Sequence, residues 1–365
     1  MDWTSLEYDW ELVAHVVDPH SCNSVIGELE GVDPAGCEVT EGYYSDTRVS
    51  AKVTTKVKLG ESDGYVPNAR IRLTLRVPRF GWERELVTGF VTDMSPSDSD
   101  GMTVRDYALD SSLWGISDDL ITSKVTCAAG SKALTVAKKL LGDRRIEYDA
   151  ANAQDRSISK VTVYEPGTGL LHLLFDIFSG YSRIGVSGHG PITIKRYTEP
   201  GKLTPQATID PRDKHTLVTG EVTEKDTSWE RPGAAIVTAN VSKSKTQGGK
   251  TVTTNEVRAG TYMAPDADRS SRNTRGYLRF AKDTYGGNKD EPTVSELSAE
   301  ARKVWNNNQG AGRSWELSVL YMDLHEGDVV TLAHADGTSS KCLVQTVTTH
   351  LDPRERTQQL TLKEV

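Results

Sequence analysis

Apolar and polar positions alternate along much of the first third of the chain. Between Val49 and Leu59 the odd-numbered residues are mostly apolar, and the even-numbered residues are all Ser, Lys or Thr. A period of two places one kind of side chain on each face of a strand, so this segment predicts a long, half-buried β-strand. The other strands expected here are Trp10–Val17, Ile71–Val77, Glu83–Met94 and Met102–Leu109. Residues 1–115 therefore predict a first β-barrel-like domain with polar side chains outward.

The period becomes helical after about residue 116. Ser131 precedes an apolar stripe that ends at Gly142, and Thr168 precedes a second stripe, Leu170–Phe178. Ser and Thr are favoured helix N-caps and Gly is a favoured stop, so two helices are expected. A hairpin is expected where Tyr181–Val186 and Pro191–Tyr197 flank the turn Gly188–Gly190. We interpret 116–200 as a small inserted α+β domain.

A β pattern returns from residue 201 and continues around one further helix. Thr293 and Glu296 have the spacing of a capping box, in which each side chain bonds the backbone amide of the other residue. Leu297, Ala301, Val304 and Trp305 then form one apolar stripe. The expected strands are His215–Val222, Ala234–Val241, Thr251–Ala259, Trp315–Tyr321, Val329–Leu332, Lys341–Thr348 and Thr357–Leu362. We expect 201–365 to be a second β-barrel-like domain, in which this helix and the last four strands form one compact unit.

Composition adds limits to this picture. The 365 residues are 36% hydrophobic and 26% charged, which is typical of a folded globular protein. The formal net charge of −8 disfavours a surface that grips nucleic acid, because such surfaces are basic. Residues 1–7 lack the basic and apolar segments of a signal peptide, and no transmembrane span is predicted.

The four cysteines are scattered, at Cys22, Cys37, Cys127 and Cys342. None belongs to a C-x-x-C pair, so we expect reduced thiols and assembly in a reducing compartment. Pairing of Cys22 with Cys37 stays open, because spacing alone does not decide it. Cys127 stands before a predicted helix, where a thiol can become nucleophilic, but a structural thiol is the favoured interpretation.

Other candidate sites have simpler interpretations. Ser244–Thr251 imitates the end of a phosphate-binding loop, but a strand-like segment follows it where the motif needs a helix, so a hairpin tip is favoured. His325, Glu326 and His334 flank a turn and could hold zinc, but exposed turn residues are the favoured interpretation. The carboxylate runs 98–100 and 117–119 are interpreted as solvated turns and caps.

Three tryptophans, Trp82, Trp114 and Trp229, could bind sugar or a partner, although a core or subunit-interface role is favoured. From these comparisons we predict no catalytic, cofactor-binding or metal-binding residues and no cofactor. The chain is expected not to be an enzyme.

The order of the elements resembles a known family. The segments that carry the resemblance are Leu86–Asp93, Thr103–Leu113, the helix Ser131–Leu141, the helix Gly169–Gly180 with Tyr197–Pro200, Val294–Trp305, and Leu324-x-x-Gly327-Asp328-Val329-Val330 with the last strand. Together they resemble the tail hub or baseplate hub proteins of tailed bacteriophages and related contractile injection systems, the late-control-D-like group. Trp114–Ile116 and the insertions 242–250 and 265–292 depart from the family pattern.

The resemblance implies a structural virion protein at the tail tip. It implies a homotrimer in which each subunit gives two barrel-like domains to a ring around the DNA channel. The implied partners are the distal tail protein ring, the tape-measure protein, and fibres or a central spike. DNA would pass through a mainly acidic lumen without specific binding, and assembly would take place in the cytoplasm of the host bacterium.

Two other functions remain open at this point. Some hub chains carry cell-wall hydrolase domains, so a tail-associated peptidoglycan hydrolase is one alternative. A carbohydrate-binding β protein that acts as a monomer is the other.

Overall fold

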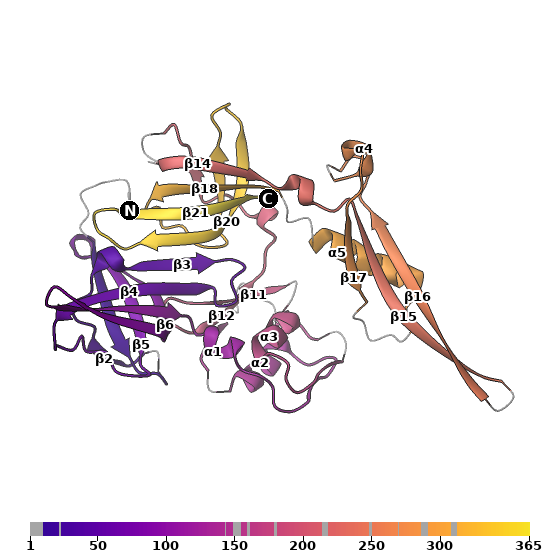
Figure 1. Ribbon diagram of the computed structural model, residues 1–365, viewed down its shortest axis with the longest axis horizontal. Coiled ribbons are helices and arrows are strands. Elements are labelled where there is room, and N and C mark those ends of the chain that lie inside the picture. Colours follow the sequence, from indigo (N-terminus) through magenta and orange to yellow (C-terminus); the bar gives the residue numbers. More distant parts are fainter. Residues whose placement is uncertain are drawn as a thin grey trace. The chain divides into compact units, whose positions relative to one another are not determined.

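The computed structural model describes most of the chain (Figure 1). The described residues are 10–21, 23–142, 144–148, 155–158, 161–178, 181–213, 218–247, 250–268, 270–285, 291–307 and 312–365. Cys22, Gly180, Gly248 and Gly249 lie outside them, as do the predicted strand start at His215 and most of the predicted helix end after Asn306.

Strands predominate among the described elements. The strands of the first part are β1 Glu11–Val17, β2 Val25–Glu28, β3 Glu38–Gly42, β4 Val49–Lys58, β5 Arg70–Val77, β6 Trp82–Ser99, β7 Met102–Asp110, β8 Val125–Cys127, β9 Ile146–Tyr148, β10 Thr162–Tyr164, β11 Ser182–Val186 and β12 Ile192–Arg196. Those of the second part are β13 Ala207–Ile209, β14 Val218–Asp226, β15 Ala234–Gln247, β16 Lys250–Met263, β17 Phe280–Thr284, β18 Arg313–Leu320, β19 Val329–Ala333, β20 Ser339–His350 and β21 Thr357–Glu364.

The helices are few and short. They are α1 Trp114–Ser117, α2 Ala133–Leu141, α3 Leu170–Phe178, α4 Arg272–Arg275 and α5 Val294–Asn307, with 3-10 turns at Pro34–Gly36, Pro78–Phe80, Pro200–Lys202 and Ser228–Glu230. The described part of the chain contains no helix long and apolar enough to cross a membrane.

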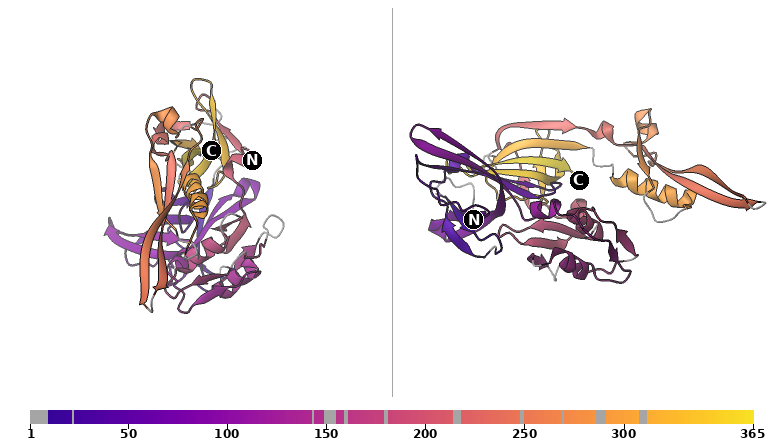
Figure 2. Two further views of the ribbon diagram at one scale, coloured as in Figure 1. Left: turned by 90° about the vertical axis from the view of Figure 1, so that its right-hand side faces the viewer. Right: turned by 60° about the horizontal axis from the view of Figure 1, so that its bottom comes forward.

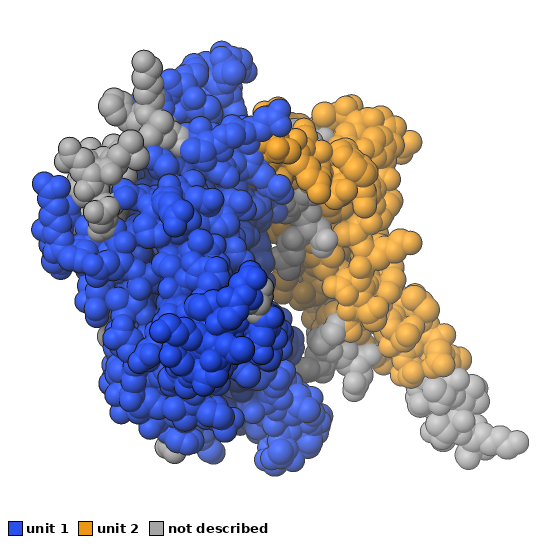
Figure 3. Space-filling view, turned by 60° about the vertical axis from the view of Figure 1, so that its left-hand side comes forward, with its two compact units in different colours: residues 1–222, 316–363, 365 blue, residues 223–315, 364 orange. Residues whose placement is uncertain are grey.

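The chain folds into two compact units (Figure 3). Unit 1 comprises residues 1–222, 316–363 and 365, and unit 2 comprises residues 223–315 and 364. The chain therefore passes into unit 2 within β14 and returns within β18. The predicted division at 1–115, 116–200 and 201–365 stays a prediction.

One sheet of 13 strands organises unit 1. Its order is β14-β18-β21-β20-β3-β4-β7-β6-β5-β1-β2, with β19 beside β20 and β13 beside β19. The long strand β20 joins the two halves, because its first residues pair with β19 and its last with β3. β1 to β7 are joined through antiparallel ladders, and β13 pairs with β19 in parallel.

The sheet does not confirm the expectation of two β-barrel-like domains. Among the described strands, β14 and β2 stand at the two ends of the path and do not pair with each other, so the sheet is open. The fold is β-rich with few helices, as predicted, but barrel closure is not confirmed. Alternation along a strand reports which face is buried and carries no information on whether the sheet edges meet.

The sequence pattern predicted most strands of this sheet, but β2, β3 and β13 were not among the expected strands, and the burial of several residues differs from the pattern. Leu59 follows the end of β4 and is 59% exposed, although the pattern placed it on the buried face. On β5, Arg72 and Thr74 are buried together with the apolar residues, although they were expected to face water. The buried guanidinium of Arg72 has polar partners, because Glu85 lies 3.1 Å from it and Thr88 accepts its Nε hydrogen at 3.0 Å.

A second core in unit 1 lies between the short helices and the small sheets of the segment 113–194. Its buried members include Leu113, Ala133, Ala137, Leu141, Leu173, Leu174 and Ile194. β12 pairs with β11 antiparallel and with β9 in parallel, which confirms the predicted hairpin. This segment contains helices and short strands, as the sequence pattern predicted, while the inserted domain 116–200 stays a prediction.

Both predicted helices exist, but their caps differ from expectation. The N-cap of α2 is Lys132, and the Asp155 carboxylate accepts the Leu134 amide hydrogen at 2.9 Å in place of a Ser131 cap. The Thr168 hydroxyl donates to the Glu165 carbonyl at 2.8 Å rather than capping α3. Asp155 lies 21 residues from Leu134, so a local motif search does not find this cap.

Unit 2 consists of a three-stranded sheet with α5 on one face. β15 and β16 form a long hairpin, and β17 pairs with β15 in parallel. The hairpin extends past the end of α5 (Figure 2). Ala235, Val237 and Ala239 pack with Leu297 and Ala301 of α5, which confirms the predicted apolar stripe.

Different residues determine where α5 begins and where it packs. The Thr293 amide donates to Glu296 at 2.8 Å, and the Glu296 amide donates to the Thr293 hydroxyl at 3.2 Å, so the capping box is confirmed. Gly260 of β16 lets α5 approach, because a Cβ there would overlap the backbone of Leu297 and Ser298. The expectation that α5 forms one compact unit with the four following strands is wrong, because α5 packs on β15–β17 in unit 2.

Candidate functional site

A charged cleft of about 460 Å³ lies in unit 1, where the hairpin β11–β12 and the loop 321–328 meet β3 and β6. Its acidic lining residues are Glu41, Glu85, Glu326 and Asp328, and its basic lining residues are Arg84, Arg183, Lys195 and His325. We call this site the charged cleft. It brings together residues that are far apart in the sequence, such as Glu41 and Glu326, which are 285 positions apart.

His325 stands at one end of the charged cleft. Its Nδ1 lies 2.9 and 3.0 Å from the two carboxylate oxygens of Glu41. Arg84 bonds both His325 and Asp323, and the Tyr321 hydroxyl donates to Asp323 at 3.0 Å. Burial raises the pKa of Tyr321 to about 12, so this hydroxyl keeps its proton at neutral pH. The network ties the loop 321–328 to β3 and β6.

Arg183 of β11 stands at the other end. It pairs with Glu326, and its guanidinium carbon lies 4.0 Å from the centre of the Tyr43 ring. Burial, and then the nearby Arg48, lower the pKa of Arg183 to about 10. Gly327 is required beside it, because its φ of 87° favours glycine and a Cβ would overlap the Arg183 guanidinium.

Asp328 completes this loop. It accepts the His325 amide hydrogen at 2.8 Å and a Gln206 side-chain hydrogen at 2.8 Å. Burial nevertheless raises the pKa of this carboxyl. The residues of the motif Leu324-x-x-Gly327-Asp328-Val329-Val330 thus have structural roles: Gly327 makes room for Arg183, Asp328 holds the loop, and the three apolar residues are buried.

The turn of the hairpin β11–β12 is bound to β6 by a second set of contacts. His189 bonds Glu85 through Nδ1 and Asn23 through Nε2, the latter at 2.6 Å. Thr88 donates to the Gly188 carbonyl at 2.8 Å, and a Cβ on Gly188 would overlap the Glu85 carbonyl. This tight contact covers the face of β5 and β6 that carries the buried Arg72.

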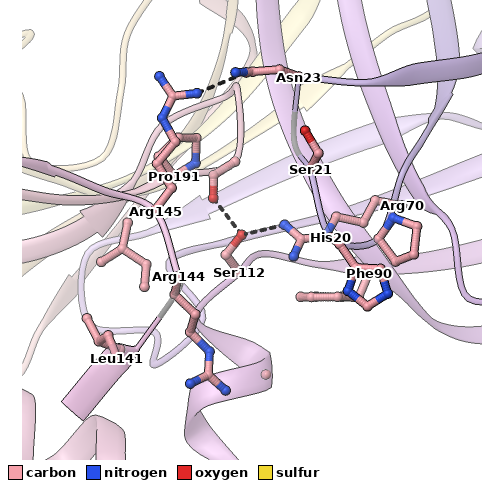
Figure 4. A pocket seen from close by; sticks show the side chains of 14 residues that line it. His20, Ser21, Asn23, Arg70, Phe90, Ser112, Leu141, Arg144, Arg145 and Pro191 are labelled. Atoms are coloured by element: carbon pink, nitrogen blue, oxygen red, sulfur yellow. Dashed lines mark hydrogen bonds between the residues drawn. The ribbon is translucent and has the colours of Figure 1, made fainter. Parts of the chain in front are cut away.

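A second site, which we call the basic cavity, lies nearby in unit 1 and has a volume of about 610 Å³ (Figure 4). Its walls come from residues 19–21 and 23, β5, β6, the segment 112–115, the end of α2 with residues 144–145, and residues 190–192. Among its described lining residues the titratable ones are His20, Arg70, Arg144 and Arg145, all basic. Residue order does not reveal this cavity, since its walls come from six separate segments.

The candidate site residues proposed from the sequence do not lie together in the structure. Cys127 is buried, and burial raises the pKa of its thiol, which disfavours a nucleophile. Cys37 and Cys342 are also buried. Ser244 and Thr251 belong to the hairpin β15–β16, so no helix follows this segment as a phosphate-binding loop would need.

The histidines and tryptophans also do not converge. His334 bonds Ser340 at 2.9 Å, whereas His325 lies in the charged cleft and is not the exposed turn residue that was expected. Across the described ranges, no three His, Cys, Asp or Glu side chains are grouped to hold a metal ion. Trp114 packs against Phe90 with ring centres 6.2 Å apart, while Trp229 is 56% exposed. Trp82 is partly buried.

The fold is similar to solved structures of tail proteins. The tail protein from Neisseria meningitidis MC58 gives a TM-score of 0.68 at 12% sequence identity, over 98% of this chain and 97% of that chain. The 43 kDa tail protein of prophage MuSo2 from Shewanella oneidensis gives 0.66 at 12% identity, over 97% and 98%. The prophage tail protein gp18 from Listeria monocytogenes EGD-e gives 0.56 at 12% identity, over 96% and 94%.

The sequence itself matches no protein-family model and no curated protein. The likeness is therefore one of fold. It extends over nearly the whole of this chain and of the three solved chains, and it confirms at that level the resemblance seen in the order of elements.

Proposed function

We propose that this chain is a structural protein of a bacteriophage tail, located at the tail tip as a baseplate hub or minor tail protein. The observation that carries the proposal is the reciprocal likeness to tail proteins, which spans 98% of this chain and 97% of the Neisseria chain. A fold shared from end to end is a stronger argument than one shared module. The order of elements, which resembles the hub group, supports the position at the tip.

The proposed assembly is a ring of three copies that joins the tail tube to the distal tip. The open edges of the large sheet support assembly, because exposed edge strands pair readily with other chains unless they are protected. At the β2 edge, Val25 and Ile26 are 47% and 50% exposed. The proposed partners are the distal tail protein ring, the tape-measure protein, and fibres or a central spike.

The proposed mechanism is mechanical and electrostatic. The ring surrounds the channel through which DNA leaves, and the net charge of −8 suits a lumen along which a polyanion slides without sticking. Virion assembly in the cytoplasm of the host bacterium belongs to this proposal, and so does the absence of enzymatic activity. A zymogram on bacterial cell walls tests the hydrolase alternative, and a glycan-binding assay on the monomer tests the carbohydrate alternative.

Electron microscopy of the purified chain, alone and co-expressed with its neighbouring tail proteins, tests the ring directly. We expect particles with threefold symmetry and an open centre. The variant Ile26→Lys places a charge on the β2 edge. We expect this variant to form no ring, while its circular dichroism spectrum stays that of the wild type. The matched control is Val163→Lys on β10, which is 43% exposed and outside the large sheet.

Monomers at high concentration and in the presence of the neighbouring proteins would contradict the ring. A ring that forms equally well in Ile26→Lys would contradict the role of the β2 edge. A ring whose lumen is basic would contradict the electrostatic part of the mechanism.

A further inference from the structure

We propose that the basic cavity binds a small multivalent anion that carries phosphate or carboxylate groups. All of its described titratable lining residues are basic, in a chain with 51 acidic and 43 basic residues other than histidine. Guanidinium groups match the geometry of carboxylates and phosphates, with which they form paired hydrogen bonds. This inference concerns a ligand site and does not depend on the proposed role in a phage tail.

Arg70 is fixed at one wall of the cavity. Its guanidinium carbon lies 4.1 Å from the centre of the Phe90 ring, and its Nη1 donates to the Ser112 hydroxyl at 3.2 Å. Ser112 in turn donates to the Gly190 carbonyl at 2.5 Å (Figure 4). An arginine held in this way loses little conformational entropy when a ligand binds, which favours binding.

Arg144 and Arg145 follow the end of α2 at another wall. Arg144 bonds Asp119 through one guanidinium nitrogen, and Arg145 donates to Asn23 at 2.9 Å and approaches Glu147 at 3.5 Å. Asp119 and Glu147 are not among the lining residues. Each guanidinium carries five N–H donors. The side chains of Arg144 and Arg145 are 42% and 50% exposed, so they are open to a ligand from solvent.

The shape of the site favours a small ligand over a nucleic acid. Its volume of about 610 Å³ lies in the range of pockets that enclose small molecules. The walls come from six segments that surround one small space. The phosphates of a duplex lie on a convex surface, which fits a groove or a flat basic patch instead. The charged cleft differs in that acidic and basic residues are equally represented in its lining.

Protection of arginines from phenylglyoxal, read by mass spectrometry on the full-length wild-type chain, tests the proposal without a mutation. Pyrophosphate and citrate represent the phosphate and carboxylate forms of the ligand, and sodium chloride at equal ionic strength controls for screening. We expect pyrophosphate or citrate to protect Arg70, Arg144 and Arg145 while Arg354, whose side chain is 91% exposed, stays reactive. The anion that protects at the lower concentration identifies the preferred group. Equal protection of Arg354, or no protection beyond that of chloride, would overturn the proposal.

Calorimetric titration of the variant Arg144→Gln/Arg145→Gln gives a second readout. Loss of charge-assisted hydrogen bonds is expected to weaken binding of pyrophosphate or citrate by about tenfold or more. Arg354→Gln removes the same charge elsewhere and is expected to bind like the wild type. Equal affinity in all three proteins would overturn the proposal. Stronger protection by a DNA duplex than by pyrophosphate at equal phosphate concentration would also overturn it, in favour of a nucleic-acid contact.

Discussion

The charged cleft and the basic cavity lie in the same unit but differ in how their charges are balanced. In the charged cleft His325 bonds Glu41 and Arg183 pairs with Glu326, so acidic and basic groups of the lining meet each other. In the basic cavity the carboxylates that pair with Arg144 and Arg145 lie outside the lining. Matched charges at a junction hold segments of the fold together, whereas a surplus of one sign leaves a site able to attract a ligand.

Removing a cation from the charged cleft is expected to have the largest effect. In Arg183→Met, Glu326 loses its partner although only 14% of its side chain is exposed. An unpaired, mostly buried carboxylate is costly, so we expect the free energy of unfolding to fall by about 3 kcal/mol. Urea denaturation followed by circular dichroism measures the change.

The matched control for this variant is Arg144→Met in the basic cavity. Its side chain and that of Asp119 are both more than 40% exposed, so we expect a loss below about 1 kcal/mol. Equal losses in the two variants would remove the distinction between the charged cleft and the basic cavity.

The next effect concerns the close contact of the β11–β12 turn with β6. In Gly188→Ala the new Cβ overlaps the Glu85 carbonyl, and the backbone has to shift to relieve it. We expect a loss of about 2 kcal/mol in the free energy of unfolding, as is usual for overpacking. Gly201→Ala, where a Cβ meets nothing within 4 Å, serves as the control and is expected to be nearly neutral. A stable Gly188→Ala protein would show that this turn is not held tightly.

A pH effect is expected from the charged cleft through Asp328. Burial raises the pKa of this carboxyl in the folded protein, so the folded state holds the proton more tightly than the unfolded chain. Stability due to this group therefore falls as pH rises from the ordinary carboxyl pKa through the raised value. We expect the wild type to gain stability relative to Asp328→Asn as pH is lowered through that window. Urea denaturation at several pH values, from below the ordinary carboxyl pKa up to neutrality, measures the difference, and parallel curves would contradict the assignment.

The smallest expected effect is the salt dependence of stability that arises from the positive charges of the basic cavity when no anion is bound. Like charges around one space repel, and added sodium chloride screens that repulsion. We expect salt to stabilise the wild type by less than about 0.5 kcal/mol relative to Arg144→Gln/Arg145→Gln. Thermal unfolding at two sodium chloride concentrations measures it. A larger salt effect in the double variant would mean that these arginines do not repel one another.

Local patterns in the sequence predicted the elements whose causes are local. The capping box of Thr293 and Glu296 is one example, since both partners lie within one turn of α5. The alternation in β4 and β5 is another, because a period of two is set by strand geometry. The prediction for Leu59 was wrong because the alternating pattern continues one residue beyond Lys58, where β4 ends.

Features that depend on distant residues were not predictable from local patterns. Asp155 caps α2 from another segment, and α5 packs on β15, β16 and β17, which precede it, rather than on the strands that follow it. His325 looks like an exposed turn residue until Glu41 and Arg84 are placed beside it by the sheet. The openness of the sheet depends on β2 and β14, at its two ends, and periodicity within either strand says nothing about the other.

The two passages of the chain between the units lie side by side. The Thr227 amide donates to the Gly312 carbonyl at 3.1 Å, and the Ser314 hydroxyl donates to the Lys225 carbonyl at 3.3 Å. The first and last residues of unit 2 are therefore adjacent, as is usual for a domain inserted into another. A short turn could close β14 onto β18 in its place, and a different module could be spliced in at the same point. Because β14 and β18 are neighbours in the large sheet, the pairing within that sheet does not depend on the length of the segment inserted between them.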